Sequence, residues 1–186
     1  MALEATFRSM LVRLQRLNDD LLVLRLTLGD KPPGSESALV DQLENTVLDM
    51  TGLLQEALDS SREALSATGR PVDLDRAWRA LTACQDCFQR IAHQFSADLI
   101  SYEKLKDLAT LGSQRGGEWF PWANSTKAGI EQCRHPLEEV SNALVGCWQE
   151  LAERPGMMSV SVQATNIGQQ IAGTPERNEF DIEGVP

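Results

Sequence analysis

The sequence contains few aromatic residues and no long hydrophobic run. Aromatic residues make up 5% of its 186 residues, and the alternating pattern of a β-strand is scarce before Met157, which disfavours a sheet protein. No apolar run approaches the roughly 20 residues of a membrane-spanning helix. The first residues lack the basic-then-apolar layout of a signal peptide. Four cysteines without secretory context favour reduced thiols, so we expect a cytoplasmic protein outside the membrane.

Positive charge is also in short supply. The chain has 17 Lys and Arg residues against 27 Asp and Glu residues, a formal net charge of −10. Nucleic acids and anionic membranes both bind basic surfaces, so this balance opposes either as an unaided partner. A nucleic-acid role would need a local basic strip on the first predicted helix, formed by Arg8, Arg13, Arg16 and Arg25. We expect no nucleic-acid partner.

Sequence motifs that carry chemistry are missing as well. The sequence has no Gly-x-Ser-x-Gly, phosphate-binding loop or His-Glu-x-x-His, and no Glu-x-x-His pair of the di-iron bundles. His93 and His135 fall outside the apolar pattern described below. In an antiparallel arrangement they lie at opposite ends, so they cannot share a haem. We therefore expect neither enzymatic activity nor a cofactor.

Apolar residues at helical spacing are abundant, most clearly between Glu118 and Leu151. Steps of four and three residues alternate there, which places the whole set on one side of a helix. A helix this one-sided is unstable alone in water and must be covered by others. Pro136 interrupts the pattern and predicts a kink, as a packing feature, a hinge or a groove for a partner. The set comprises Thr126, Ile130, Cys133, Leu137, Val140, Leu144, Cys147 and Leu151.

Three further stretches show the same spacing. Residues 3–28 carry it without a break, and Leu11, Leu22 and Leu26 widen their apolar face, which favours a bundle of several helices over a two-stranded coiled coil. A second helix is predicted from a Ser35 or Ser37 cap to residue 67. A third is predicted from about residue 73 to 112, with a one-residue slip in its pattern near Leu99. The fourth begins at Pro121 or just after residues 124–125.

These patterns predict an all-α protein, an antiparallel four-helix bundle with long helices over residues 1–156. Residues 157–186 have almost no helical period and predict an irregular C-terminal tail, extended or partly disordered. Met158, Val160 and Val162 alternate with polar residues, as in a short strand. We expect this segment to lie across the bundle or to add to a sheet edge of a partner protein.

A second candidate for partner binding is the aromatic loop of Trp119, Phe120 and Trp122, which follows a glycine-rich turn. Exposed aromatic side chains often anchor protein interfaces. The alternative is that both tryptophans continue the fourth helix and close the end of the core. The acidic outer side of the second helix has the same two interpretations, a solvated face or a docking surface for a basic partner.

The cysteines support a second hypothesis. Cys84-x-x-Cys87 with Cys133 and His135 has the residue types of a zinc site, but the helix register puts the two pairs at different levels. Cys147 falls near the level of Cys87, so Cys84, Cys87 and Cys147 could form a metal- or redox-responsive cluster; otherwise they are small core residues. The leading hypothesis is a non-enzymatic adaptor, regulator or assembly subunit that acts through protein–protein contacts, and no oligomeric state is indicated.

Overall fold

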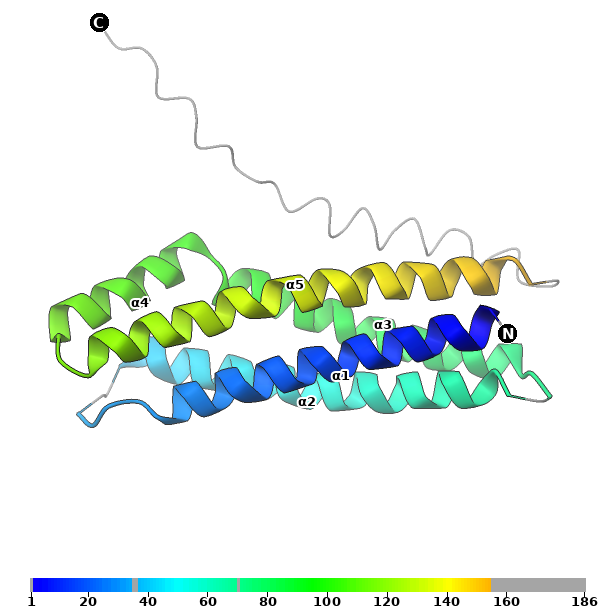
Figure 1. Cartoon of the computed structure of the whole chain (residues 1–186), viewed down its shortest axis with the longest axis horizontal. Coiled ribbons are helices and arrows are strands. Elements are labelled where there is room, and N and C mark those ends of the chain that lie inside the picture. Colours follow the sequence, from blue (N-terminus) through cyan, green and yellow to red (C-terminus); the bar gives the residue numbers. More distant parts are fainter. Residues whose placement is uncertain (1, 35–36, 70, 155–186) are drawn as a thin grey trace, which may run out of the picture.

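The structure, a computed structural model, describes residues 2–34, 37–69 and 71–154. Within these ranges the chain is all-α, with five α-helices and one π-helical segment (Figure 1). The elements are α1 (Ala2–Gly29), α2 (Ala38–Ala67), α3 (Leu74–Gln94), η1 (Phe95–Leu99), α4 (Tyr102–Arg115) and α5 (Trp119–Ala152). The predicted tail, residues 157–186, lies outside the described residues.

The helices pack side by side in antiparallel pairs. α1 lies between α2 and α5, α3 packs against α2, and α4 packs against the first part of α5 (Figure 1). On one side of α1, Gln55 of α2 donates a hydrogen bond to Asn18 at 2.8 Å. On the other side, Gln132 of α5 donates to Asp20 at 3.3 Å. The predicted all-α fold with antiparallel packing is therefore confirmed.

The predicted single third helix is wrong. Residues 74–115 form α3, η1 and α4 instead of one continuous helix. In η1 the N–H of Ile100 donates to the carbonyl of Phe95 at 2.9 Å, the wider i to i+5 bond of a π-turn. Ser101 then begins α4, because its hydroxyl accepts from the N–H of Lys104 at 3.3 Å. The slip in the apolar pattern near Leu99 marks this break.

The helix α1 is held by a complete apolar seam. All eight residues of its predicted stripe are buried, and each such leucine contributes roughly 1.5–3 kcal/mol by leaving water. The expected widening of this face is only partly present: Leu11 is half-buried, whereas Leu22 and Leu26 are exposed. The buried residues are Leu3, Phe7, Met10, Leu14, Leu17, Leu21, Leu24 and Leu28.

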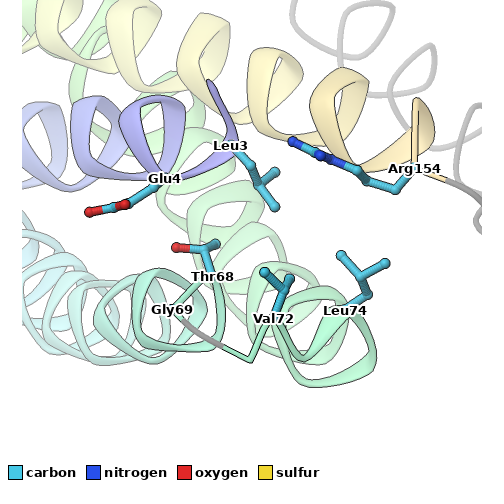
Figure 2. Close-up of a pocket in the computed structure, with 7 residues that line it drawn as sticks. All are labelled: Leu3, Glu4, Thr68, Gly69, Val72, Leu74 and Arg154. Carbon is cyan, nitrogen blue, oxygen red and sulfur yellow. The ribbon is translucent and has the colours of Figure 1, made fainter. Parts of the chain in front are cut away.

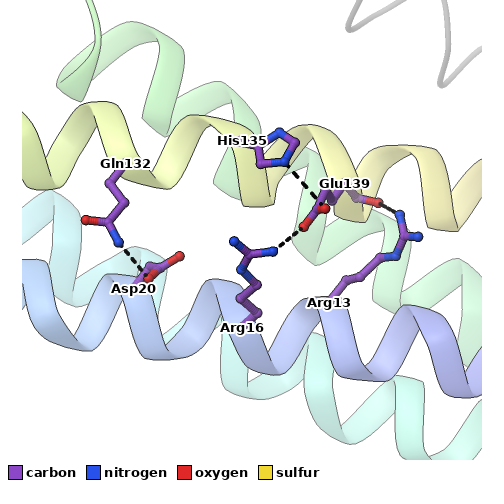
Figure 3. Close-up of polar contacts among 6 residues, drawn as sticks. All are labelled: Arg13, Arg16, Asp20, Gln132, His135 and Glu139. Carbon is purple, nitrogen blue, oxygen red and sulfur yellow. Dashed lines mark hydrogen bonds and ion pairs between the residues drawn. The ribbon is translucent and has the colours of Figure 1, made fainter.

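The helix α5 begins at Trp119, earlier than predicted, and continues through the buried Pro136. Proline has no N–H to offer the carbonyl one turn earlier. Contacts from α1 hold the next turn: Arg13 donates to the backbone carbonyl of Glu139 at 3.2 Å, and Arg16 pairs with the Glu139 carboxylate at 3.2 Å. His135 also reaches that carboxylate, at 3.5 Å (Figure 3). Interhelical polar contacts therefore anchor the turn that follows Pro136.

Replacing a helical glycine by alanine is expected to have opposite effects on stability at two positions. A Cβ at Gly112 of α4 would lie 2.7 Å from the Cβ of Ala123 in α5, whereas a Cβ at Gly52 of α2 would meet no heavy atom within 4 Å. We expect Gly52→Ala to stabilise the protein by about 0.5–1 kcal/mol through helix propensity. Gly112→Ala is expected to destabilise it by about 1–3 kcal/mol through overpacking. Urea unfolding of both variants measures the two effects.

A compensating variant isolates the clash at Gly112. In the pair Gly112→Ala with Ala123→Gly, the contact at 2.7 Å is removed from the other side, so part of the lost stability should return. If Gly112→Ala alone is as stabilising as Gly52→Ala, the close packing of α4 on α5 is incorrect.

Candidate interaction surface

The predicted aromatic site is mostly enclosed. Trp119 and Trp122 are 8% and 7% exposed, and their rings meet edge to face with centroids 5.3 Å apart. The Trp122 indole donates to the carbonyl of Thr27 at 2.8 Å. The guanidinium of Arg115 lies 4.5 Å from the centre of the Trp119 ring, where a cation–π attraction operates. The two indoles therefore close the end of the core, which was the alternative interpretation of this loop.

Phe120 is the exposed member of that loop, at 52% of its side chain. The other predicted partner-binding residues, Met158, Val160 and Val162, lie outside the residues that the structure describes. Of the six predicted partner-binding residues, Phe120 is therefore the one that is exposed among the residues that the structure describes. A single exposed phenylalanine is common on soluble proteins and does not define a site.

Three of the four arginines in the predicted basic strip of α1 are engaged in contacts within the fold, and Arg25 is the exception among the described residues. Arg8 pairs with Glu4 of the same helix at 2.8 Å, and Arg13 and Arg16 both contact Glu139 of α5 (Figure 3). Several acids of α2 are also engaged, because Glu44 pairs with Lys31 and Glu63 with Arg76. Much of the surface charge therefore serves contacts within the fold.

The cysteines are free thiols, and three of the four are buried. Burial raises the pKa of Cys84 and of Cys133 to about 12. Burial also raises the pKa of Cys147, with a smaller contribution from the neighbouring Cys84. Cys87 is half-buried and its Sγ lies 3.6 Å from a carboxylate oxygen of Glu56.

Metal binding and rapid thiol oxidation both require the thiolate form. The raised pKa values keep these groups protonated at neutral pH. In the part of the chain described here, no group of three or more His, Cys, Asp or Glu residues has an arrangement that could hold a metal ion. The metal-binding form of the cysteine hypothesis therefore has no geometric support among these residues, although Cys84 interacts with both Cys87 and Cys147.

An exposed strip of leucines lies along the outer side of α1 and α2. Leu22 and Leu26 of α1 are 38% and 70% exposed, and Leu48 of α2 is 49% exposed. The Gln55–Asn18 hydrogen bond sets the register. Because the helices are antiparallel, seven residues back from Gln55 on α2 correspond to seven residues forward from Asn18 on α1, about two turns in each case. Leu48 therefore lies opposite the α1 segment between Leu22 and Leu26.

Gly52 continues this strip toward Gln55. It is exposed, and the space where its Cβ would stand is empty to 4 Å. A glycine inside a helix costs about 1 kcal/mol relative to alanine, and here it leaves open space about one turn from Leu48. We call Leu22, Leu26, Leu48 and Gly52 the leucine strip. Sequence reasoning missed it as a site, although Leu22 and Leu26 depart from the α1 seam.

A pocket of about 390 Å³ lies at the opposite end of the helices from the aromatic pair. It is bounded by the start of α1, the turn between α2 and α3, and the residues after α5. Figure 2 shows Leu3 facing Val72 and Leu74 across it, with Glu4 and Arg154 on separate sides. One anion and one cation on separate walls do not define a chemical class of ligand.

Comparison of the chain with family models, curated proteins and solved structures gives no match in any of the three. No helix in the described ranges is both long and apolar enough to cross a bilayer. The surface of the protein itself therefore supplies the evidence about function, and the leucine strip is its most distinctive described feature.

Proposed function

We propose that this protein is a non-enzymatic helical adaptor that binds another protein through the leucine strip. The observation that carries the proposal is three exposed leucines on two adjacent antiparallel helices, at a similar level in the register that the Gln55–Asn18 hydrogen bond sets. Exposed apolar residues scattered singly are ordinary, whereas a contiguous group bordered by polar residues marks an interaction site. The hydrogen bond between Asn18 and Gln55 joins α1 and α2 about one turn from Leu22.

The strip is also preorganised for binding. Leu22 directly follows the buried Leu21, and Leu26 lies two residues from each of the buried Leu24 and Leu28, so the core fixes the backbone of both. A partner that covers them does not need to order a flexible segment, which lowers the entropic cost of association. A cytoplasmic location belongs to the same proposal, supported by four free cysteines.

Replacing the three leucines by glutamine tests the proposal. Glutamine has nearly the helix propensity of leucine, so Leu22→Gln, Leu26→Gln and Leu48→Gln together should leave the fold intact and remove the apolar surface. We expect proteins that the wild-type chain captures from its native lysate to be reduced at least about tenfold, a loss of some 1.4 kcal/mol. Quantitative mass spectrometry of both captures measures this.

Val12→Gln is the matched control, because Val12 is 58% exposed on α1 but stands apart from the strip. Capture should be unchanged in that variant. If the triple variant keeps every wild-type partner while circular dichroism shows an unaltered fold, the leucine strip is not the binding surface.

The aromatic loop and the tail are separate proposed contacts that the same capture can test. Phe120→Ala removes the exposed ring of the loop, and truncation after Pro155 removes Met158, Val160 and Val162. Loss of partners only on truncation would place recognition in the tail instead of the strip.

A further inference from the structure

Aspartates stand at both ends of the leucine strip. Asp19 of α1 and Asp30, directly after the end of α1, are exposed and continue the row of Leu22 and Leu26 at helical spacing. They are eleven residues apart, which is about 16 Å along a helix. On α2, the exposed Asp41 lies seven residues before Leu48, and the exposed Asp59 lies seven residues after Gly52. Seven residues are about two turns of a helix.

The antiparallel register places two of these acids toward each end of the strip. With Gln55 opposite Asn18, Asp30 and Asp41 fall at one end of the strip, and Asp19 and Asp59 fall at the other. Arg62 pairs with Asp59 at 2.7 Å and Lys31 pairs with Glu44 at 2.8 Å, and the exposed Arg25 stands between Leu22 and Leu26 in the sequence. Asp19 at one end and Asp30 with Asp41 at the other have no ion-pair partner among the described residues, so unpaired negative charge remains at both ends of the strip.

We propose that the occupant of the leucine strip is an amphipathic helix of three to four turns with an apolar stripe and lysine or arginine near both ends. This inference rests on the proposed function and names the class of partner. A seam between two helices accepts the apolar face of a third helix. A β-strand has no sheet edge to join here, because the N–H and C=O groups of α1 and α2 are bonded within their helices.

The charges around the strip favour such a helix over a second copy of this chain as the occupant. In a symmetric dimer the same surface appears on both sides of the interface. The aspartates of one copy would then lie near those of the other, and like charges in an interface disfavour association. A basic helix instead places opposite charges at each end of the strip.

Synthetic peptides test the inference on the full-length protein. The probe is a fluorescein-labelled helix-forming peptide of about 14 residues, or four turns, with leucines on one side and lysines at both ends; a second peptide carries glutamates in place of the lysines. We expect the lysine peptide to bind at least about tenfold more tightly in a fluorescence anisotropy titration. Raising the salt concentration should weaken its binding, since exposed charges are screened.

Two matched variants separate the strip from net charge. Asp19→Asn with Asp30→Asn removes two acids at the strip, and Glu103→Gln with Asp107→Asn removes two exposed acids on α4. We expect the first pair to weaken lysine-peptide binding about three- to tenfold and the second to leave it unchanged; Leu22→Gln with Leu26→Gln should weaken it as well. Equal effects of both charge pairs, or equal affinity for the two peptides, would overturn the inference.

The outcome is independent of the capture experiment. If the leucine substitutions abolish capture of native partners but the lysine peptide shows no preference, the adaptor function stands and the basic-helix partner does not. If sedimentation shows the wild-type chain to be a dimer that Leu26→Gln dissociates, the occupant is a second copy and the inference is wrong.

Discussion

Replacing Trp148 with alanine is expected to lower the free energy of unfolding by about 3–5 kcal/mol. Trp148 of α5 is fully buried, and its ring meets the ring of Trp78 on α3 edge to face with centroids 6.5 Å apart. Alanine would leave a large cavity and remove this aromatic contact, which is worth about 0.5–1.5 kcal/mol beyond the buried area. Thermal unfolding followed by circular dichroism should show a melting temperature lower by roughly 6–20 °C.

Phe120→Ala is the control for this experiment. Phe120 is also an aromatic residue of α5, but half of its side chain is in water, so its removal should change stability by less than about 1 kcal/mol. Equal effects of the two substitutions would mean that the packing of α5 on α3 is not as the structure describes.

The contrast between these two residues shows what helical periodicity can predict. Every member of the predicted α5 stripe, from Thr126 to Leu151, is buried, and so is every member of the α1 stripe. Spacing near 3.5 identifies the residues that share one side of a helix, and in a bundle that side faces the core. The fold class and the seams of α1 and α5 could therefore be predicted from the sequence alone.

Periodicity does not predict how many neighbouring helices cover the flanks of a stripe. Leu11 and Leu22 both flank the α1 seam, yet Leu11 is half-buried and Leu22 is exposed. Both lie one residue from a buried position of the same seam, so spacing along α1 does not distinguish them. The leucine strip therefore required a three-dimensional register that the sequence does not contain explicitly.

The break in the third predicted helix has a similar cause. A one-residue slip in an apolar pattern can be accommodated by a change of supercoil, by a bend or by a π-turn. The chain adopts a π-turn at η1 followed by the Ser101 cap. The slip locates the irregularity, but the choice among these three outcomes depends on packing against α2 and α5.

Alkaline conditions are expected to destabilise the protein steeply through its buried thiols. Burial raises the pKa of Cys84 and Cys133 from the ordinary 9.0 to about 12, and it raises that of Cys147 as well. The unfolded chain therefore releases these three protons at a lower pH than the folded protein does. The three protonated thiols therefore contribute to the stability of the folded protein. This contribution is complete below pH 9 and is lost as the pH rises through the window from 9 to about 12.

Each buried thiol contributes a slope of about 1.4 kcal/mol per pH unit within that window. Urea unfolding in the presence of a reductant should show a loss of about 4 kcal/mol for the three thiols together between about pH 8 and about pH 10. The combined variant Cys84→Ala, Cys133→Ala and Cys147→Ala is expected to be less stable at neutral pH, since alanine leaves small cavities. Its stability should nevertheless fall much less between the same two pH values.

Cys87→Ala supplies the matched control, because the Cys87 thiol is only half-buried. Desolvation is the largest cause of its raised pKa, followed by the charge of Glu56, and solvent screens both effects at a partly exposed site. The Cys87→Ala variant should therefore keep most of the wild-type pH slope. If the triple variant keeps the full slope as well, the alkaline loss arises from other groups, and Cys84, Cys133 and Cys147 are not enclosed as they are in this fold.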